Sequence, residues 1–113
     1  MIPILDRSVF LRPIAHRGLH DVSRGIVENT ASAFQAAIDK GYGIECDVRA
    51  AAGGVPAVFH DVTLDRLIDT GEQTDVAIAG FGAKDLAALR YRAAARPAEG
   101  IITLADLLDM TAG

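Results

Sequence analysis

The sequence has little of what marks several classes of protein. Its one cysteine, Cys46, cannot form an internal disulfide, and its apolar neighbours favour a buried, reduced thiol. A formal net charge of −4 gives no overall attraction for nucleic acid or an anionic membrane, so an anionic ligand would need local cations or a metal. No apolar run is long enough to cross a bilayer, and no signal peptide is visible. We therefore expect a globular protein without a nucleic-acid partner or stable membrane insertion, compatible with a cytoplasmic location.

The chain has 113 residues, half of them hydrophobic, which is within the range of one small domain. It stops at Gly113 just as a predicted helix ends, whereas an α/β pattern normally continues with another strand. We therefore interpret it as the front part of a larger domain.

The first half of the chain predicts one βαβ unit with parallel strands. A short strand over residues 12–16 leads into a loop that runs to about Val27. Asn29 is the expected N-cap of the following helix and Gly41 its C-terminal signal. The helix is indicated by four apolar residues at helical spacing, Ala33, Phe34, Ala37 and Ile38.

An acidic strand over residues 42–48 follows the helix. Side chains alternate along a strand, so Glu45 and Asp47 share one face and Ile44, Cys46 and Val48 the other. Two carboxylates this close repel each other unless a cation or a proton lies between them. Oxygen ligands of this kind suit Mg²⁺ or Ca²⁺ better than zinc. The alternative is a solvated face of an edge strand.

After a turn at residues 50–54, residues 55–60 predict a second short strand. Pro56 cannot donate to a central ladder, so we expect an edge strand. A hairpin centred near Ala52 would return His60 to about the level of Glu45.

The rest of the chain shows less regular structure. Residues 61–82 are turn-rich, Leu86 and Leu89 indicate a short helix through Arg90, and residues 92–100 form a connector. Thr103 and Asp106 resemble a capping box. The helix that they open is expected to place three residues on one face, Leu104, Leu107 and Leu108.

Polar residues occur at the ends of these predicted strands, where the chemistry of parallel α/β proteins is usually located. Taken singly they have ordinary explanations: a lone histidine is more often a surface residue, Arg17 could be a surface cation and Asp61 a turn residue. Packing does not readily explain the whole ordered set, His16, Arg17, Glu45, Asp47 and His60.

Four ordered blocks of residues resemble the glycerophosphodiester phosphodiesterase family, from about Pro13 to Met110. A further match, Ile102-Thr103-Leu104, resembles the usual entry to the family's next helix. The blocks are His16-Arg17-Gly18, Glu28-Asn29-Thr30, Glu45-Cys46-Asp47, and His60-Asp61 followed by Thr63-Leu64-Asp65-Arg66.

This resemblance implies an α/β fold, the TIM (β/α)₈ barrel of the phospholipase-C-like phosphodiesterases, with only its first βα units in this chain. Residues 1–113 would be the N-terminal portion of the domain. Residues 61–98 would be a small insertion that family members carry after the second histidine.

The resemblance also implies metal-dependent hydrolysis of small glycerophosphodiesters to glycerol 3-phosphate and an alcohol. Glu45 and Asp47 would bind the divalent metal, Mg²⁺ or Ca²⁺. His16 and His60 would be the acid–base pair, and Arg17 would hold the phosphate. The family's third metal ligand is a glutamate on the strand after the next helix, and this chain ends before that strand.

These roles agree with the chemistry of a phosphodiester, whose negative charge needs neutralising and whose alkoxide leaving group needs a proton. One alternative is a catalytically silent module that binds a polyol phosphate or a partner chain. Another is a related barrel phospholipase, which the lack of a signal peptide or an apolar membrane patch disfavours.

Overall fold

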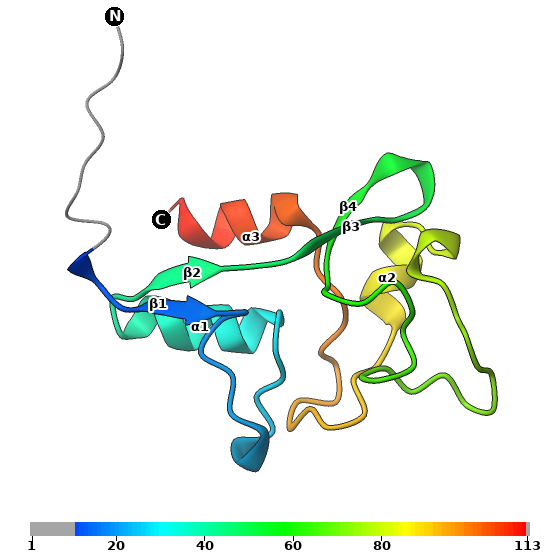
Figure 1. The fold of residues 1–113 in the computed structure, drawn as a ribbon, viewed down its shortest axis with the longest axis horizontal. Helices are drawn as coiled ribbons and strands as arrows, with labels where there is room; N and C mark the ends of the chain where they lie inside the picture. Colours follow the sequence, from blue (N-terminus) through cyan, green and yellow to red (C-terminus); the bar gives the residue numbers. More distant parts are fainter. Residues whose placement is uncertain (1–10, 113) are drawn as a thin grey trace, which may run out of the picture.

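A computed structural model describes residues 11–112 of the chain (Figure 1). Among these residues the strands form two separate two-stranded sheets, β1 with β2 and β3 with β4. None of the helices in this range is long and apolar enough to cross a membrane. The elements are β1 (Ile14–His16), α1 (Ala31–Asp39), β2 (Gly43–Glu45), β3 (Val48–Ala50), β4 (Pro56–Val58), α2 (Ala83–Ala88) and α3 (Leu104–Thr111), with 3₁₀ turns at Val22–Arg24, Ala52–Gly54 and Ile78–Gly80.

The predicted βαβ unit is confirmed. β1 and β2 are parallel, and α1, which connects them, packs against β2 (Figure 1). The register places His16 directly beside Glu45. The C-terminal residues of the two strands therefore meet at one edge of the sheet.

The start of α1 differs from the prediction by one residue. The N-cap is Thr30, whose hydroxyl accepts a hydrogen bond from the backbone N–H of Ala33 at 3.3 Å. Asn29 has a left-handed backbone (φ 56°), and its amide contacts Asp47 instead. The predicted C-terminal signal is confirmed, because Gly41 follows the last turn with φ 72°.

The acidic strand is interrupted. β2 ends at Glu45 and β3 begins at Val48, so Cys46 and Asp47 lie between two strands rather than inside one. Glu45 and Asp47 lie on one side as predicted, because both contact Arg17. Val48 departs from the predicted alternation: its side chain is exposed, whereas Ile44 and Cys46 pack on a buried cluster, because the strand is broken before Val48.

The hairpin of β3 and β4 has the expected antiparallel register. Val48 pairs with Val58, and Phe59 donates its N–H to the carbonyl of Asp47 at 3.0 Å. Continued by one step, this pairing brings His60 opposite Cys46, within one residue of the predicted level. β4 is not an open edge along its length, since Val58 also donates to the carbonyl of Ile102 at 2.9 Å.

Two groups of buried side chains form the core. The smaller group, Phe34, Val58 and Leu107, joins α1, β4 and α3. Cys46 packs against it, and burial raises the pKa of its thiol. The larger group joins the hairpin to the segment that follows, so this turn-rich segment is packed into the core; its members include Ala57, Phe59, Leu64, Ile68, Ile78, Leu86, Tyr91 and Ile101.

The two later helices match their local signals with small differences. The predicted capping box forms, because Thr103 Oγ1 accepts from the N–H of Asp106 at 3.2 Å and Asp106 Oδ2 accepts from the N–H of Thr103 at 2.9 Å. Leu104, Leu107 and Leu108 were expected on one face; Leu107 is buried, whereas Leu108 is 58% exposed and does not share its burial. α2 ends at Ala88, and Leu89 is its C-cap.

Helix α1 packs directly against the loop that follows β1. Gly18 has φ 79°, and Leu19 donates its N–H to the carbonyl of Ala33 at 2.9 Å. A Cβ atom at residue 18 would lie 2.8 Å from the Cβ of Ala33, closer than real Cβ contacts allow. The absence of a side chain at Gly18 is therefore what allows the loop that carries Arg17 to approach the helix.

Gly18→Ala is expected to destabilise the protein by more than Gly53→Ala, as measured by denaturant unfolding. Gly53 has φ 73° but no atom within 4 Å of its would-be Cβ, so it reports backbone strain alone, about 1–2 kcal/mol. At Gly18 the contact with Ala33 adds to that strain, by about 1–3 kcal/mol. Equal losses in the two variants would contradict the close packing of this loop on α1.

Candidate active site

His16 ends β1 and Arg17 follows it in a turn, and both lie close to Glu45, the acidic residue of β2. The Nε2 atom of His16 lies 3.7 Å from Oε2 of Glu45, and the backbone N–H of Arg17 donates to the same oxygen at 3.0 Å. Arg17 has a left-handed backbone (φ 60°), which bends the chain back over the strand end. The His16 side chain is 70% exposed and is therefore open to a ligand.

The Arg17 guanidinium lies between two further carboxylates. Its Nη1 donates to Oε2 of Glu28 at 2.8 Å, and its Nε lies 3.3 Å from Oδ2 of Asp47. This Nε is buried but is not aligned for a hydrogen bond. The arginine is thus held by charge on two sides, with one of its N–H groups lacking a hydrogen-bond partner.

Asn29 holds Asp47 in this arrangement. Its Nδ2 donates to Oδ2 of Asp47 at 3.1 Å, and its Oδ1 accepts from the backbone N–H of Asp47 at 3.3 Å. Asn29 is 1% exposed, and the two hydrogen bonds to Asp47 give both its amide nitrogen and its amide oxygen a partner inside the protein. Sequence reasoning gave Asn29 only a capping role, although it lies in one of the matching blocks.

The second histidine is held by its chain neighbour. Nδ1 of His60 lies 2.6 Å from Oδ1 of Asp61, which is therefore more than a turn residue. Arg66 donates to both oxygens of Asp61, from Nε at 2.8 Å and from Nη2 at 3.2 Å. These hydrogen bonds, first from Arg66 and then from His60, lower the pKa of Asp61 to about 2.

Glu28 connects the two histidine regions. Arg66 donates to both of its carboxylate oxygens at 2.9 Å, and Arg17 donates to one of them. Hydrogen bonding by Arg66, and to a lesser extent by Arg17, lowers the pKa of Glu28. Sequence reasoning assigned no role to Glu28, Asp61 or Arg66, and the only signal for them was their place in the matching blocks.

The carboxylates of Glu45 and Asp47 are the type of oxygen ligand that a hard divalent cation prefers, but two carboxylates are fewer than such a cation needs. Each uses one oxygen toward the protein; within residues 11–112, Oε1 of Glu45 and Oδ1 of Asp47 accept no hydrogen bond. The same range contains no group of three or more side chains that could hold a metal. The two residues would thus supply part of the coordination that Mg²⁺ or Ca²⁺ requires.

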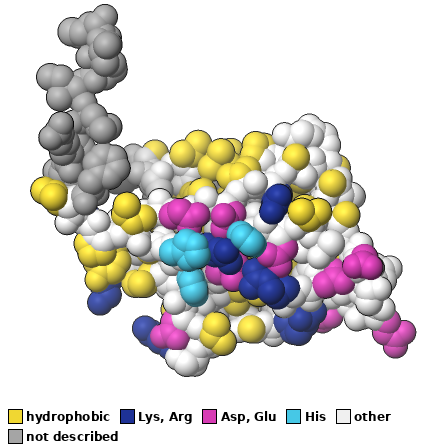
Figure 2. Space-filling view, viewed as in Figure 1, with side chains coloured by type: hydrophobic (Ala, Val, Ile, Leu, Met, Phe, Trp, Pro, Cys, Tyr) yellow, Lys and Arg dark blue, Asp and Glu magenta, His cyan; other side chains and the backbone are white. Residues whose placement is uncertain are grey.

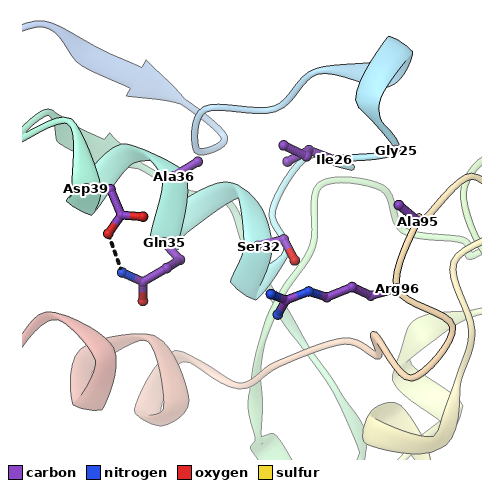
Figure 3. Close-up of a pocket in the computed structure, with 8 residues that line it drawn as sticks. All are labelled: Gly25, Ile26, Ser32, Gln35, Ala36, Asp39, Ala95 and Arg96. Carbon is purple, nitrogen blue, oxygen red and sulfur yellow. Dashed lines mark hydrogen bonds between the residues drawn. The ribbon is translucent and has the colours of Figure 1, made fainter.

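The charged and histidine side chains gather near the centre of one face of the molecule (Figure 2). A pocket of about 250 Å³ lies elsewhere, between α1 and the loops around residues 25–26 and 95–96 (Figure 3). Gln35 and Asp39, which are hydrogen-bonded at 2.9 Å, line it, and it contains none of the residues proposed from the sequence. The candidate site is therefore the charged face and not this pocket.

Comparison with known families decides the relationship. The family described as "Glycerophosphoryl diester phosphodiesterase family" matches residues 16–113. The chain belongs to this family. The matched range includes all the blocks of residues on which the resemblance rests, from His16-Arg17-Gly18 onward.

Among curated proteins, this family member is similar to glycerophosphodiester phosphodiesterase 1 of Bos taurus and of Homo sapiens. The bovine protein is 44% identical over 66 residues, and the human protein is 42% identical over 66 residues. Each match covers 56% of this chain and 19% of the relative. The matched segment is thus about a fifth of the length of these curated relatives.

Among solved structures, the chain is similar to a glycerophosphodiester phosphodiesterase from Agrobacterium tumefaciens, with a TM-score of 0.70 and 29% identity over 90% of this chain and 42% of that one. It is also similar to an Oleispira antarctica phosphodiesterase in complex with the product sn-glycerol-3-phosphate. Here the TM-score is 0.69 and the identity 30%, over 89% of this chain and 40% of the other. The predicted fold class is confirmed: the chain forms part of the family's TIM barrel.

Titration of Asp61 followed by carboxyl NMR is expected to show a midpoint near pH 2. Because this pKa is below the ordinary value of 3.8, the stability contributed by the charged carboxylate is complete above about pH 4 and is lost as the pH falls toward 2. Arg66→Gln should raise the midpoint by more than His60→Gln, since Arg66 makes the larger contribution. An unchanged midpoint in Arg66→Gln would contradict the origin of the shift.

Proposed function

We propose that the protein containing this chain hydrolyses glycerophosphodiesters to glycerol 3-phosphate and an alcohol. The proposal rests chiefly on the convergence of His16, Arg17 and Glu45 at adjoining ends of β1 and β2, with Asp47 beside Arg17. Membership of the family supports it, as does the relative from Oleispira antarctica whose structure contains sn-glycerol-3-phosphate.

Arg17 is the proposed phosphate-binding residue. The planar fork of a guanidinium matches phosphate oxygens in charge and in geometry. Glu28 and Asp47 hold Arg17 in place, which fixes its orientation before substrate arrives.

His16 and His60 are the proposed acid–base pair. One would remove the proton from the attacking water and the other would donate a proton to the departing alkoxide, which histidine can do near neutral pH. His16 is exposed beside Glu45, and His60 is partly exposed and held at Nδ1 by Asp61. The atom of His60 that is available for proton transfer is therefore Nε2.

Glu45 and Asp47 are the proposed protein ligands of a divalent cation, Mg²⁺ or Ca²⁺. Such a cation, when bound, neutralises charge on the phosphate oxygens and activates the attacking water. The second oxygen of each carboxylate is available for it. Binding without catalysis, as a module for polyol phosphates or a partner chain, is the second candidate. The observation behind it is that residues 11–112 contain no group of three or more side chains that could hold a metal ion.

We further propose that residues 1–113 are the N-terminal portion of the catalytic domain and that residues 61–98 are the family insertion. The packing of this segment supports the second assignment. Leu64, Ile68 and Leu86 are completely buried against the hairpin, and Ile101 returns the chain to the core beside β4. A reduced Cys46 and a cytoplasmic location remain predictions from the sequence.

Glu45→Gln and Asp47→Asn in the full-length protein are each expected to abolish stabilisation by Mg²⁺ or Ca²⁺, measured as a shift in melting temperature. Each removes one charged oxygen ligand while keeping the size of the side chain. Asp109→Asn, on the exposed side of α3, is a matched control and should keep the full shift. Parental metal stabilisation in both site variants would show that the carboxylates form only a solvated face.

His16→Ala and His60→Ala are each expected to reduce turnover by about 100-fold or more, the scale of losing a positioned acid or base. The double variant should lose less than the product of the single losses, because groups that act together are not additive. The shift in melting temperature caused by Mg²⁺ or Ca²⁺ should be unchanged in both single variants.

A nitrophenyl ester, whose leaving group needs little protonation, should restore turnover in only one of the two variants. That variant identifies the acid. His20→Ala is the control and should keep parental turnover, because within residues 11–112 the side chain of His20 makes no hydrogen bond or ion pair with the proposed site residues. Parental turnover in both site variants would show that these histidines are not catalytic.

A further inference from the structure

Arg66 contacts two carboxylates at once, although sequence reasoning gave it no role. Its Nε and Nη2 donate to Asp61 at 2.8 and 3.2 Å. Its Nη1 and Nη2 donate to the two oxygens of Glu28 at 2.9 Å each. Both carboxylates are therefore held in the two-point manner that only a guanidinium provides, so Arg66 fixes their position relative to each other.

Each of these carboxylates in turn contacts a proposed site residue. Oδ1 of Asp61 is 2.6 Å from Nδ1 of His60, and Oε2 of Glu28 accepts from Nη1 of Arg17 at 2.8 Å. An unbroken series of hydrogen bonds therefore runs from His60 through Asp61, Arg66 and Glu28 to Arg17, the proposed phosphate-binding residue.

The contact with Asp61 determines which nitrogen of His60 carries the proton. Asp61 is ionised near neutral pH, hydrogen bonds from Arg66 hold its carboxylate in place, and an ionised carboxylate can only accept. Nδ1 of His60 must therefore donate to it. In the neutral ring this leaves the Nε2 lone pair available to a substrate or water.

The backbone that carries Arg66 is firmly held. Arg92 donates to the carbonyls of Asp65, Arg66 and Ile68 at 2.9, 3.2 and 2.7 Å. The Ile68 side chain next to this turn is completely buried. The Arg66 side chain itself is 46% exposed, so its ion pairs are expected to contribute little to the stability of the fold. Its main effect should be on the geometry of the site.

We propose that Arg66 is a positioning residue that orients His60 through Asp61 and Arg17 through Glu28. The expected effect on kcat/KM rests on the proposed hydrolytic function. The expected effect on the ring tautomer of His60 does not. Loss of Arg66 would free Asp61 and Glu28 to move independently, which would leave His60 without a single preferred ring tautomer.

The test uses Arg66→Gln, Arg66→Lys and Asp61→Asn in the full-length protein. Arg66→Gln is expected to lower kcat/KM by about 10-fold to 100-fold, as for other residues that orient a functional side chain, with little change in melting temperature. Arg66→Lys keeps the charge but cannot make two-point hydrogen bonds to both carboxylates, so its loss of kcat/KM should be smaller than that of Arg66→Gln but not absent. Ring-nitrogen NMR should show His60 protonated at Nδ1 in the parent and a mixture of tautomers in Arg66→Gln and Asp61→Asn.

Arg90→Gln is the matched control. Arg90 is in the same segment, and within residues 11–112 its side chain donates only to the carbonyls of Ala87, Ala88 and Leu89 at the C-terminal end of α2. It should keep parental kcat/KM and the parental His60 tautomer.

Parental kcat/KM and an unchanged tautomer in Arg66→Gln would overturn the proposal, as would an equal loss in Arg90→Gln. Should Arg66→Gln fail to fold, Arg66→Lys and Asp61→Asn decide by the same two measurements. If the parent hydrolyses no glycerophosphodiester, the proposed function fails. The nitrogen spectra then still support or overturn the positioning role.

Discussion

The partial burial of Arg17 is the constraint on which the rest of the site depends. A guanidinium cannot lose its charge in a protein, so removing it from water requires carboxylates nearby. Its side chain is 20% exposed, and Glu28 and Asp47 compensate its charge. These residues come from the loop before α1 and from the segment after β2, so one charge holds together parts of the chain on both sides of the helix.

The packing around Arg17 follows from this requirement. Its backbone N–H bonds to Glu45 from a left-handed conformation, and Gly18, next in sequence, must be small because α1 lies directly against it. The side chain of Asn29 bonds to Asp47 instead of capping α1, and Thr30 is the N-cap. Local preferences at the start of α1 are thus adjusted to fit the charges of the site.

The segment after the hairpin has a place in the same arrangement. Its apolar residues, including Leu64 and Ile68, complete the larger core, and this burial fixes the turn that carries Arg66. Arg66 then returns to Glu28 across 38 residues of sequence. The segment therefore does more than connect two parts of the barrel, because it brings a cation to the carboxylate that already holds Arg17.

Much of this protein could be predicted from local sequence signals. Helical spacing and Gly41 indicated α1, residue alternation placed Glu45 and Asp47 together, and the Thr103 capping box formed as expected. The position of His60 followed from the register of a short hairpin. These features depend on contacts between residues that are near in sequence, or on a regular pairing that extends from one turn.

Other features were decided only by the tertiary structure. The break between β2 and β3, the exposure of Leu108 and the change of cap from Asn29 to Thr30 each depend on what the folded chain places beside those residues. The bridge from Arg66 to Glu28 is the clearest case. No local pattern marks either residue as the other's partner, because their ion pair exists only once the core has brought the two segments together.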